Sequence, residues 1–322
     1  MGRRILVTDH IFDALDVERR IAAAADVEVI ERSVETPEAV SEAIEETEPN
    51  AIAVAYAQIS RSVLESADGL EAVGRYGIGV DSVDIRAATE TGTVVVNVPS
   101  YSVDEVSTHA FALLLACARS ITVYDRDLKV GGWDWEVGAP IPRLSESTLG
   151  LIGFGKIPRR TAEKAAGFGL DVIAQDPYVD AEEMDEWGVE KAGLGQLLER
   201  SDFISVHTPL TGETRGMLGT AEFERMKESA VLINTSRGPV VDVGALNAAL
   251  EAGEIAGAGL DVFPEEPPVD EPIVDRPDVI ASPHAAWYSE ESIVELRETL
   301  FSDLVGILRG EKPRNPVNPE VL

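Results

Sequence analysis

The most informative stretch in this chain of 322 residues is Leu149-Gly150-Leu151-Ile152-Gly153-Phe154-Gly155-Lys156-Ile157-Pro158. It places two glycines directly after an apolar run that is typical of a buried strand, and before a helical pattern over residues 159–167. We expect Gly153 to form a tight turn and Gly155 to let the backbone approach a pyrophosphate. A strand, a glycine turn and a helix in this order are typical of a dinucleotide-binding unit, although a glycine pair by itself also occurs in plain turns.

The helix after the turn supplies the anion-binding groups in this interpretation. The amides of Lys156 and Ile157 stand in its first turn, where they have no partner within the helix, and we expect them to bind the phosphates. Amide donors need no basic side chain, which suits an acidic protein. Pro158 stands where the dinucleotide-binding pattern has its third glycine, so the sequence leaves open how closely this helix packs on the strand.

A carboxylate follows at the distance that a ribose-binding acid requires. Asp176 lies 23 residues after Gly153, at the end of the next strand-like run, and such an acid accepts hydrogen bonds from the ribose hydroxyls. It favours NAD, because its charge would repel the additional phosphate of NADP. The alternative is a solvated aspartate that opens an Asp-Pro turn. Taken with the glycine turn, Asp176 predicts an NAD site.

Strand-like runs alternate with helical patterns along almost the whole chain. In the first third these runs are Ile5–Thr8, Val27–Ile30, Ala51–Ala55, Ala72–Arg75 and Val94–Asn97. From residue 149 onward they are Leu149–Ile152, Val172–Ala174, Phe203–Val206, Val231–Asn234, Ala258–Asp261 and Val279–Ala281. Continuous apolar strands between helices indicate parallel sheets that are covered on both faces. We therefore predict an α/β protein with two doubly wound parallel-sheet domains of the Rossmann or flavodoxin-like type.

Several helix boundaries are marked by capping residues. Thr36 before Pro37 predicts a helix start, and Ser102-Val103-Asp104-Glu105 has the pattern of a capping box that opens a long apolar helix. Another long helix is expected over about 289–309, with Gly310 at its C-terminal cap.

The charge of the chain excludes several classes of partner. There are 58 acidic and 27 basic residues, which gives a net charge of −31. A surface this negative repels nucleic acids and anionic membranes, so neither is expected as a partner. Such a balance resembles that of proteins from halophiles that accumulate salt, where concentrated salt screens the self-repulsion. An acidic protein from a non-halophile is the alternative.

The sequence predicts a cytoplasmic protein. The apolar run near the start, Ile5–Val7, ends after three residues, which is far too short for a signal peptide. Nowhere does an apolar run approach the roughly 20 residues of a membrane span. Cys117 is the only cysteine, so a disulfide framework is excluded.

Three charged residues follow strand-like runs in the part of the chain from residue 149 onward. Arg237 comes after 231–234, Glu266 after 258–261, and His284 after 279–281. Open α/β sheets bind ligands at the carboxyl ends of their strands, so these side chains can converge at one edge. An arginine, a carboxylate and a histidine beside a nicotinamide suit hydride transfer to a 2-oxo acid. Taken singly, each could equally form an ordinary ion pair or helix cap.

The other histidines have plainer interpretations. His207 ends the strand-like run 203–206 and could line the nucleotide pocket. His109 lies within an apolar helix, where a structural role is the expectation. His10 lies in a loop after the first strand.

Together these residues resemble the D-isomer-specific 2-hydroxyacid dehydrogenase family over nearly the whole chain. The motifs that carry the resemblance are Gly77-Ile78-Gly79-Val80-Asp81, Asn97-Val98-Pro99, the glycine turn, His207-Thr208-Pro209-Leu210-Thr211, Asn234-Thr235-Ser236-Arg237-Gly238, Gly259-Leu260-Asp261-Val262-Phe263, Glu266-Pro267 and Pro283-His284. The interval of 29 residues from Arg237 to Glu266, and of 18 from Glu266 to His284, also fits the family.

The resemblance implies a particular domain organisation. The substrate domain would be discontinuous, formed by residues 1–101 and 288–322, and the NAD-binding domain, residues 102–287, would be inserted between its two parts. The active site would then lie in a cleft between the domains. Members of the family are usually homodimers that associate through the nucleotide domain.

It also implies roles for individual residues. His284 would donate or accept the proton, Glu266 would be its partner, and Arg237 would hold the substrate carboxylate. Backbone amides of Ile78 and Gly79 would help to bind that carboxylate. The NAD-binding residues, besides the glycine turn and Asp176, would be His207, Thr208, Pro209, Thr214, Thr235, Ser236 and Asp261, of which Asp261 would bind the nicotinamide carboxamide. No metal is expected.

The substrate within the class of small 2-oxo and 2-hydroxy acids stays open. Pro283 stands where formate dehydrogenases of the family carry glutamine, which argues against formate. Trp287 resembles the active-site tryptophan of the C-terminal-binding protein branch and would favour an apolar tail, or it packs at the hinge before the last helix. Arg75 could supply a second cation to the substrate, or it forms a plain ion pair at a strand end.

Two alternatives to a 2-oxo-acid reductase of this general kind remain. Phosphoglycerate dehydrogenase shares most of the motifs. The C-terminal-binding protein branch also includes NADH-responsive co-repressors, so a dinucleotide-gated binding protein with little turnover is the other alternative. The complete set of Arg237, Glu266 and His284 favours an enzyme.

Overall fold

The computed structural model describes residues 2–322 and consists of two compact units. The first unit joins the chain up to Tyr101 with Ser289–Leu322, and the second comprises Ser102–Tyr288. The C-terminal segment therefore folds with the N-terminal one.

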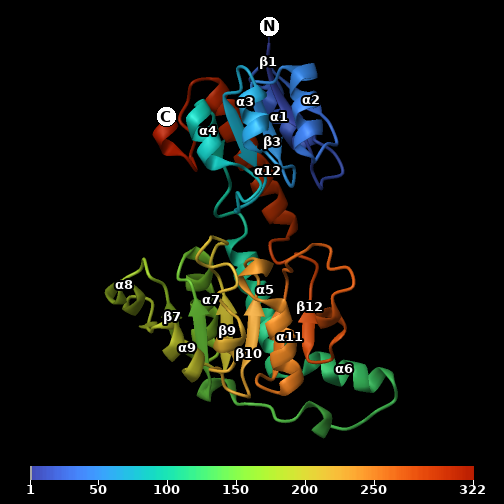
Figure 1. Ribbon diagram of the computed structural model, residues 1–322, viewed down its shortest axis with the longest axis vertical. Helices are drawn as coiled ribbons and strands as arrows, with labels where there is room; N and C mark the ends of the chain where they lie inside the picture. Colours follow the sequence, from blue (N-terminus) through green and yellow to red (C-terminus); the bar gives the residue numbers. More distant parts are fainter. Residues whose placement is uncertain (1) are drawn as a thin grey trace. The chain divides into compact units, whose positions relative to one another are not determined.

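The first unit is a five-stranded parallel sheet with the strand order β2-β1-β3-β4-β5 (Figure 1). Its elements are β1 (Arg3–Val7), α1 (Asp16–Ala23), β2 (Val27–Glu31), α2 (Pro37–Thr47), β3 (Ala51–Val54), α3 (Arg61–Ser66), β4 (Ala72–Arg75), α4 (Ile85–Thr91), β5 (Val94–Val96), α12 (Glu290–Leu308) and the 3-10 turn η5 (Pro319–Val321). This is the flavodoxin-like strand order, in which the chain changes direction between β1 and β3.

Helices cover both faces of this sheet. Apolar residues of α2, α3 and α4 pack on one face in a single cluster. On the other face α12 lies so close to β4 that a side chain at Gly74 would meet Leu300 and Leu304. As predicted, Thr36 caps α2, accepting from the Ala39 amide at 3.3 Å.

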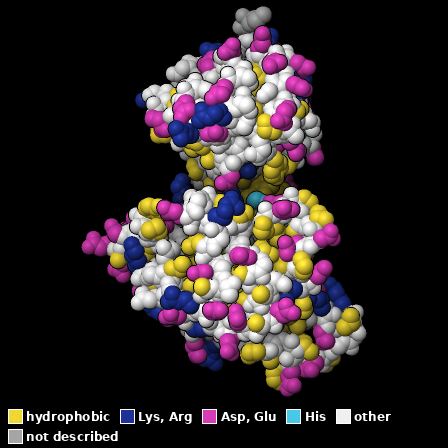
Figure 2. All heavy atoms as spheres, viewed as in Figure 1, with side chains coloured by type: hydrophobic (Ala, Val, Ile, Leu, Met, Phe, Trp, Pro, Cys, Tyr) yellow, Lys and Arg dark blue, Asp and Glu magenta, His cyan; other side chains and the backbone are white. Residues whose placement is uncertain are grey.

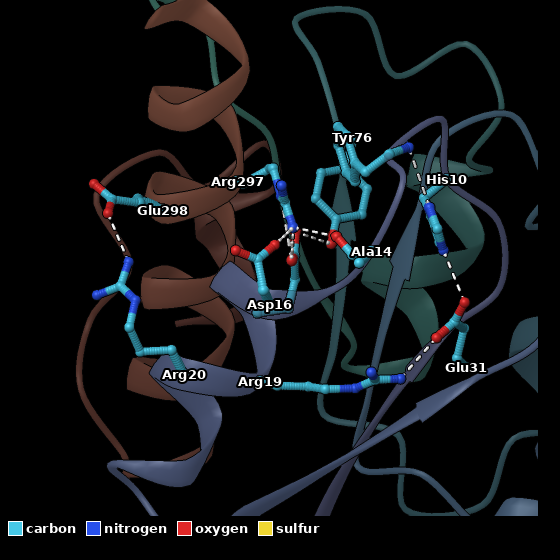
Figure 3. Close-up of polar contacts among 11 residues, drawn as sticks. His10, Ala14, Asp16, Arg19, Arg20, Glu31, Tyr76, Arg297 and Glu298 are labelled. Carbon is cyan, nitrogen blue, oxygen red and sulfur yellow. Dashed lines mark hydrogen bonds and ion pairs between the residues drawn. The ribbon is translucent and has the colours of Figure 1, made fainter. Parts of the chain in front are cut away.

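A buried ion pair holds α12 against α1. The Arg297 guanidinium donates three hydrogen bonds to the Glu18 carboxylate, at 2.9, 3.2 and 2.6 Å, and Glu18 is fully buried. The Tyr76 hydroxyl donates to the same carboxylate at 3.2 Å. Figure 3 shows Arg297 reaching from its helix to Asp16 and the Ala14 carbonyl as well. Burial, together with the charge of Glu18, raises the pKa of Tyr76 well above its ordinary value, so this hydroxyl stays protonated.

The second unit is a seven-stranded parallel sheet with the order β12-β11-β10-β9-β6-β7-β8. Its elements are α5 (Val103–Ala118), α6 (Ile121–Lys129), η1 (Glu136–Gly138), η2 (Leu144–Glu146), β6 (Thr148–Ile152), α7 (Lys156–Gly167), β7 (Asp171–Gln175), α8 (Ala181–Asp185), β8 (Glu190–Lys191), α9 (Leu194–Arg200), β9 (Phe203–Val206), α10 (Thr220–Phe223), β10 (Val231–Asn234), η3 (Gly238–Val240), α11 (Val243–Ala252), β11 (Gly257–Leu260), η4 (Pro272–Asp275) and β12 (Val279–Ala281). The chain reverses its direction of winding between β6 and β9, and ligands bind at such a point in open α/β sheets.

Two separate apolar clusters lie on the two faces of this sheet. One joins the strands to α9, α10 and α11, and the other joins them to α5 and α7. The predicted fold class, two doubly wound parallel α/β sheets, is therefore confirmed.

Three local expectations were wrong. The capping box at Ser102 does not form: within residues 2–322 the buried Ser102 hydroxyl has no hydrogen-bond partner. Helix α7 begins at Lys156 and not at Arg159, because Pro158 fits the first turn, where no intrahelical donor is needed. The strand β8 was missed, since its two residues are exposed and carry no apolar pattern.

The surface is acidic (Figure 2), and the described helices differ from typical membrane spans. Acidic side chains are spread over the visible face of each unit (Figure 2). In the described part of the chain, no single helix is long and apolar enough to cross a membrane. By length and composition alone, α5 and α6 would pass as a pair bent by 60°.

The buried pair in the first unit gives a testable consequence. Arg297→Met leaves the Glu18 carboxylate buried without a cation, and we expect the free energy of unfolding to fall by about 3–5 kcal/mol. Urea denaturation measures this loss. The control is Arg20→Gln, since Arg20 and Glu298 form an exposed pair at 2.8 Å that contributes far less. Equal losses in the two variants would contradict the role given to the buried pair.

Candidate active site

The predicted catalytic side chains lie on loops at the carboxyl edge of the second sheet. His284 follows β12, Glu266 follows β11, and His284 Nδ1 lies 2.6 Å from Glu266 Oε2. The side chains are 40% and 35% exposed, so both are accessible to a ligand. The structure thus forms a histidine–carboxylate pair from residues on two loops.

The backbone of His284 has a conformation that residues other than glycine rarely adopt. Its φ angle is +52°, which costs about 1–3 kcal/mol unless the surroundings impose it. Here the His284 amide donates to the carbonyls of Asp261, at 2.8 Å, and Ser282, at 3.1 Å. The Trp287 indole donates to the His284 carbonyl at 2.9 Å. The turn is therefore fixed from both sides.

Asp261 holds the turn that carries His284 through several hydrogen bonds. It is fully buried and accepts from the Ser282 hydroxyl at 2.6 Å and from the amides of Ala285 and Ala286 at 2.9 Å each. Its acceptor positions are thus largely used within the protein. The structure gives Asp261 a role in holding His284, while the contact with nicotinamide stays a prediction.

Arg237 lies on the neighbouring loop, after β10. A side chain at Gly238 would come within 2.0 Å of the Phe263 backbone, so the Arg237 and Glu266 loops are in direct contact only because residue 238 is glycine. Asn234 shapes the Arg237 loop: its amide group donates to the Arg237 carbonyl at 3.1 Å.

The electrostatics favour an ionised Glu266. Burial alone would raise the pKa of its carboxyl, but hydrogen bonds from His284 and the Phe263 amide, with the charge of Arg237, hold the pKa below its ordinary value. Because the carboxylate can only accept, Nδ1 of His284 must carry a proton. The other ring nitrogen, Nε2, is therefore the one that can exchange a proton with a ligand.

The glycine turn lies at the point where the sheet reverses its winding. Gly153 has a φ of +96°, and a side chain there would lie 2.9 Å from the His207 carbonyl. A side chain at Gly155 would meet nothing within 4 Å. Among residues 2–322, the amides of Lys156 and Ile157 have no backbone acceptor. Free amides at a helix N-terminus, next to a glycine with open space around it, fit a bound diphosphate.

Asp176 is partly engaged within the protein. Its carboxylate accepts from the Phe154 amide and from the Tyr178 amide, both at 2.8 Å. The second bond is the turn that the alternative interpretation expected. Since an ionised carboxylate has about four acceptor positions, Asp176 can also accept from ribose hydroxyls.

The loop after β9 carries four predicted NAD-binding residues. Burial lowers the pKa of His207 to about 3, so its ring is neutral, and Nε2 lies 2.9 Å from the Ser205 hydroxyl. Thr208 follows it beside Gly153. The Thr214 hydroxyl donates to the Pro209 carbonyl at 2.6 Å. This hydrogen bond of Thr214 closes the loop.

The loop after β10 carries two more of the predicted NAD-binding residues, Thr235 and Ser236. Ser236 bonds the Asn234 side chain through both its amide, at 3.0 Å, and its hydroxyl, at 2.9 Å. The Thr235 hydroxyl is buried and has no hydrogen-bond partner among the described residues. A polar atom left unpaired in this way fits a loop that bonds to a ligand.

The predicted substrate loop belongs to the first unit. It follows β4, and a side chain at Gly77 would lie 1.5 Å from Nη1 of Arg75, so the guanidinium lies across the loop. The Asn97 side chain donates to the Ile78 carbonyl at 2.6 Å. Within residues 2–322 the amides of Ile78 and Gly79 bond no backbone carbonyl.

Sequence reasoning missed the residues that support the site. Asn234 and Asn97 shape the two loops that were predicted to bind substrate. His109, on α5, lies 2.9 Å from the Ser282 hydroxyl, across 173 residues of sequence. No local pattern pairs residues that far apart, whereas an asparagine just before a predicted loop is a signal that could have been used.

Several known proteins are similar to this chain in sequence. A family model described as "D-isomer specific 2-hydroxyacid dehydrogenase, NAD binding domain" matches residues 111–286. A glyoxylate reductase from Korarchaeum cryptofilum is 42% identical over 271 residues, which cover 82% of this chain and 81% of that protein. A D-3-phosphoglycerate dehydrogenase from Methanocaldococcus jannaschii is 39% identical over 81% of this chain, but the match spans only 50% of its own length.

A solved structure shows the same fold. The D-lactate dehydrogenase of Aquifex aeolicus, in complex with NAD and lactic acid, superposes with a TM-score of 0.86 at 27% identity. The match covers 96% of each chain.

The space in front of the glycine turn can be tested directly. Gly155→Val places a side chain where a diphosphate would meet the amides, and we expect NADH to bind at least about tenfold more weakly. Titration of NADH fluorescence measures the affinity. Gly167→Ala is the matched control, because that position, at the end of the same helix, is also open. Unchanged NADH affinity in Gly155→Val would exclude this loop as the diphosphate site.

Proposed function

The chain belongs to the D-isomer-specific 2-hydroxyacid dehydrogenase family, and from this we propose that it reduces a small 2-oxo acid with His284 as the proton donor. It is an NAD-dependent oxidoreductase that acts on CH–OH groups. The observation that carries the proposal is the bond of 2.6 Å between His284 and Glu266 on loops beside Arg237.

The residues that would hold the cofactor are those of the glycine turn and the loops beside it. The amides of Lys156 and Ile157 have no backbone acceptor among residues 2–322, and the space at the neighbouring Gly155 is open, while Asp176 retains acceptor positions for a ribose. The unpaired Thr235 hydroxyl adds a polar group. When bound, NADH supplies the hydride that C2 of the substrate receives.

His284 moves the proton. Glu266 keeps Nδ1 protonated, so the imidazolium releases its proton from Nε2 to the carbonyl oxygen of the 2-oxo acid, and C=O becomes CH–OH. In the reverse direction neutral Nε2 accepts the hydroxyl proton. The ionised Glu266 stabilises the imidazolium in both directions.

Arg237 binds the carboxylate of the substrate in this proposal. A guanidinium can grip a carboxylate with two parallel hydrogen bonds, which also fixes the orientation of the adjacent carbonyl group. The amides of Ile78 and Gly79 are assigned to the same carboxylate. Trp287 supplies an apolar wall.

A specific observation favours a second candidate substrate. Arg75 lies across the substrate loop at Gly77, where it would attract a second anionic group. A phosphorylated 2-oxo acid, as in the phosphoglycerate dehydrogenases among the relatives, fits such a cation. The alternatives therefore differ in the charge of the substrate tail.

The test is NADH oxidation by the purified protein in multimolar KCl against glyoxylate, pyruvate, 2-oxoisocaproate and 3-phosphohydroxypyruvate. Reactions with NADPH and at low salt run alongside. Saturable turnover of glyoxylate or pyruvate supports the proposal, while a preference for 3-phosphohydroxypyruvate selects the second candidate. NADH binding without turnover of any acid would overturn both and favour a dinucleotide-gated binding protein.

Two variants separate proton transfer from substrate binding. His284→Ala removes the proton donor, and we expect kcat to fall by roughly 10²–10⁴ while NADH affinity is retained. Arg237→Ala mainly raises KM for the 2-oxo acid. Steady-state kinetics with NADH titration distinguishes these effects, with Arg225→Ala as a control on a surface arginine. Near-normal turnover in His284→Ala would show that another group donates the proton.

We also propose that the enzyme is a homodimer that associates through residues 121–137. This segment, which we call the apolar arm, begins with α6, which lies outside the layers of the second unit (Figure 1). Its Val130, Trp133 and Trp135 are 85%, 91% and 74% exposed. Large apolar side chains gathered in this way are typical of an interface.

Charge substitutions in the apolar arm test this association. We expect Trp133→Glu to shift the protein from dimer to monomer, because a carboxylate cannot be buried at an apolar interface without cost. Sedimentation equilibrium in concentrated KCl measures the mass. Tyr178→Glu is the control, since Tyr178 is 88% exposed elsewhere in the same unit. A monomeric wild type would contradict the proposal.

A further inference from the structure

Helix α5 brings a second histidine behind the turn that carries His284. His109 Nε2 lies 2.9 Å from the Ser282 hydroxyl oxygen and 3.5 Å from Asp261 Oδ1. The Ser282 hydroxyl in turn lies 2.6 Å from the same Oδ1. His109, Ser282 and Asp261 therefore form one chain of polar contacts.

The chemistry of the three groups sets the direction of these hydrogen bonds. The Ser282 hydroxyl donates its single proton to Asp261. The Ser282 oxygen must then accept from His109, which requires a proton on Nε2. Ser282 therefore donates to Asp261 and accepts from His109.

Close packing holds His109 in this place. A side chain at Gly259 would lie 3.0 Å from the Cβ of Leu113, so α5 rests directly on β11 one turn beyond His109. Gly259 also stands two residues before Asp261. The helix, the strand and the buried carboxylate are consequently fixed relative to one another.

From these contacts we propose that His109 is a positioning residue for His284, acting through Ser282 and Asp261. The turn needs such support, because His284 has a φ of +52° and is held by the carbonyls of Asp261 and Ser282. Without the N–H of His109, Ser282 loses its donor and the Ser282–Asp261 pair can rotate. His284 then loses the orientation that aligns Nδ1 with Glu266. This inference rests on the proposed role of His284 in proton transfer.

Kinetics provide the first test. We expect His109→Ala to lower kcat about tenfold, since small misplacements of a reacting group have effects of this size or larger, and to leave KM for the 2-oxo acid within about twofold. His109→Gln can place an N–H near the position of Nε2 and should restore most of kcat. Thr108→Ala, at an exposed neighbouring position on α5, is the matched control. Wild-type kcat in His109→Ala, or no recovery in His109→Gln, would overturn the proposal.

A double-substitution cycle tests the route. If His109 acts through Ser282, then kcat of His109→Ala/Ser282→Ala should equal that of Ser282→Ala alone. Multiplied losses in the double variant would mean that the two residues act independently, and would overturn the pathway.

A readout without turnover separates this inference from the proposed function. The Nδ1 proton of His284, shared with Glu266 at 2.6 Å, should give a downfield resonance in the NMR spectrum of protein with ¹⁵N-labelled histidine, assigned by its loss in His284→Ala. We expect the resonance to disappear in His109→Ala and to remain in His109→Gln and Thr108→Ala. An unchanged resonance in His109→Ala would overturn the inference. Absence of turnover in the wild type would instead overturn only the proposed function.

Discussion

Parallel strand pairing is the constraint on which both units depend. Because every strand in a parallel sheet runs in the same direction, all loops that follow a strand emerge at one edge. The residues after β10, β11 and β12 are far apart in sequence, yet the sheet places them on neighbouring loops. The same geometry sets the glycine turn after β6 beside the loop after β9. The proposed active site is thus a consequence of strand direction and strand order.

Buried carboxylates fix the positions of segments that the sheets only bring close to one another. Glu18 and Asp261 are both fully buried carboxylates, and each binds a segment from a distant part of the sequence. Glu18 holds α12 through Arg297, while Asp261 holds the turn of His284 through three donors. A buried carboxylate without partners is strongly destabilising. Glu18 therefore favours one position of α12. Asp261 favours one conformation of the turn that carries the proposed proton donor, His284.

Glycines allow backbone segments to come into contact where a side chain would keep them apart. Gly238 lets the Arg237 loop touch the backbone that leads to Glu266, and Gly259 lets α5 rest on β11. Gly153 does the same between the glycine turn and His207. Amides at the glycine turn can bind an anion without basic side chains. This solution suits a protein with a net charge of −31.

The sequence alone was enough to predict the two parallel α/β sheets, the glycine turn and the family, because these depend on local patterns: apolar runs, glycine spacing and short ordered motifs. It also placed Arg237, Glu266 and His284 at strand ends. The packing of the folded chain alone buries Asp261 beneath the His284 turn and sets His109 behind Ser282. It also decided that the Ser102 hydroxyl is left unpaired. Those outcomes depend on contacts between residues far apart in the chain, and such contacts exist only after the helices have packed on the sheet.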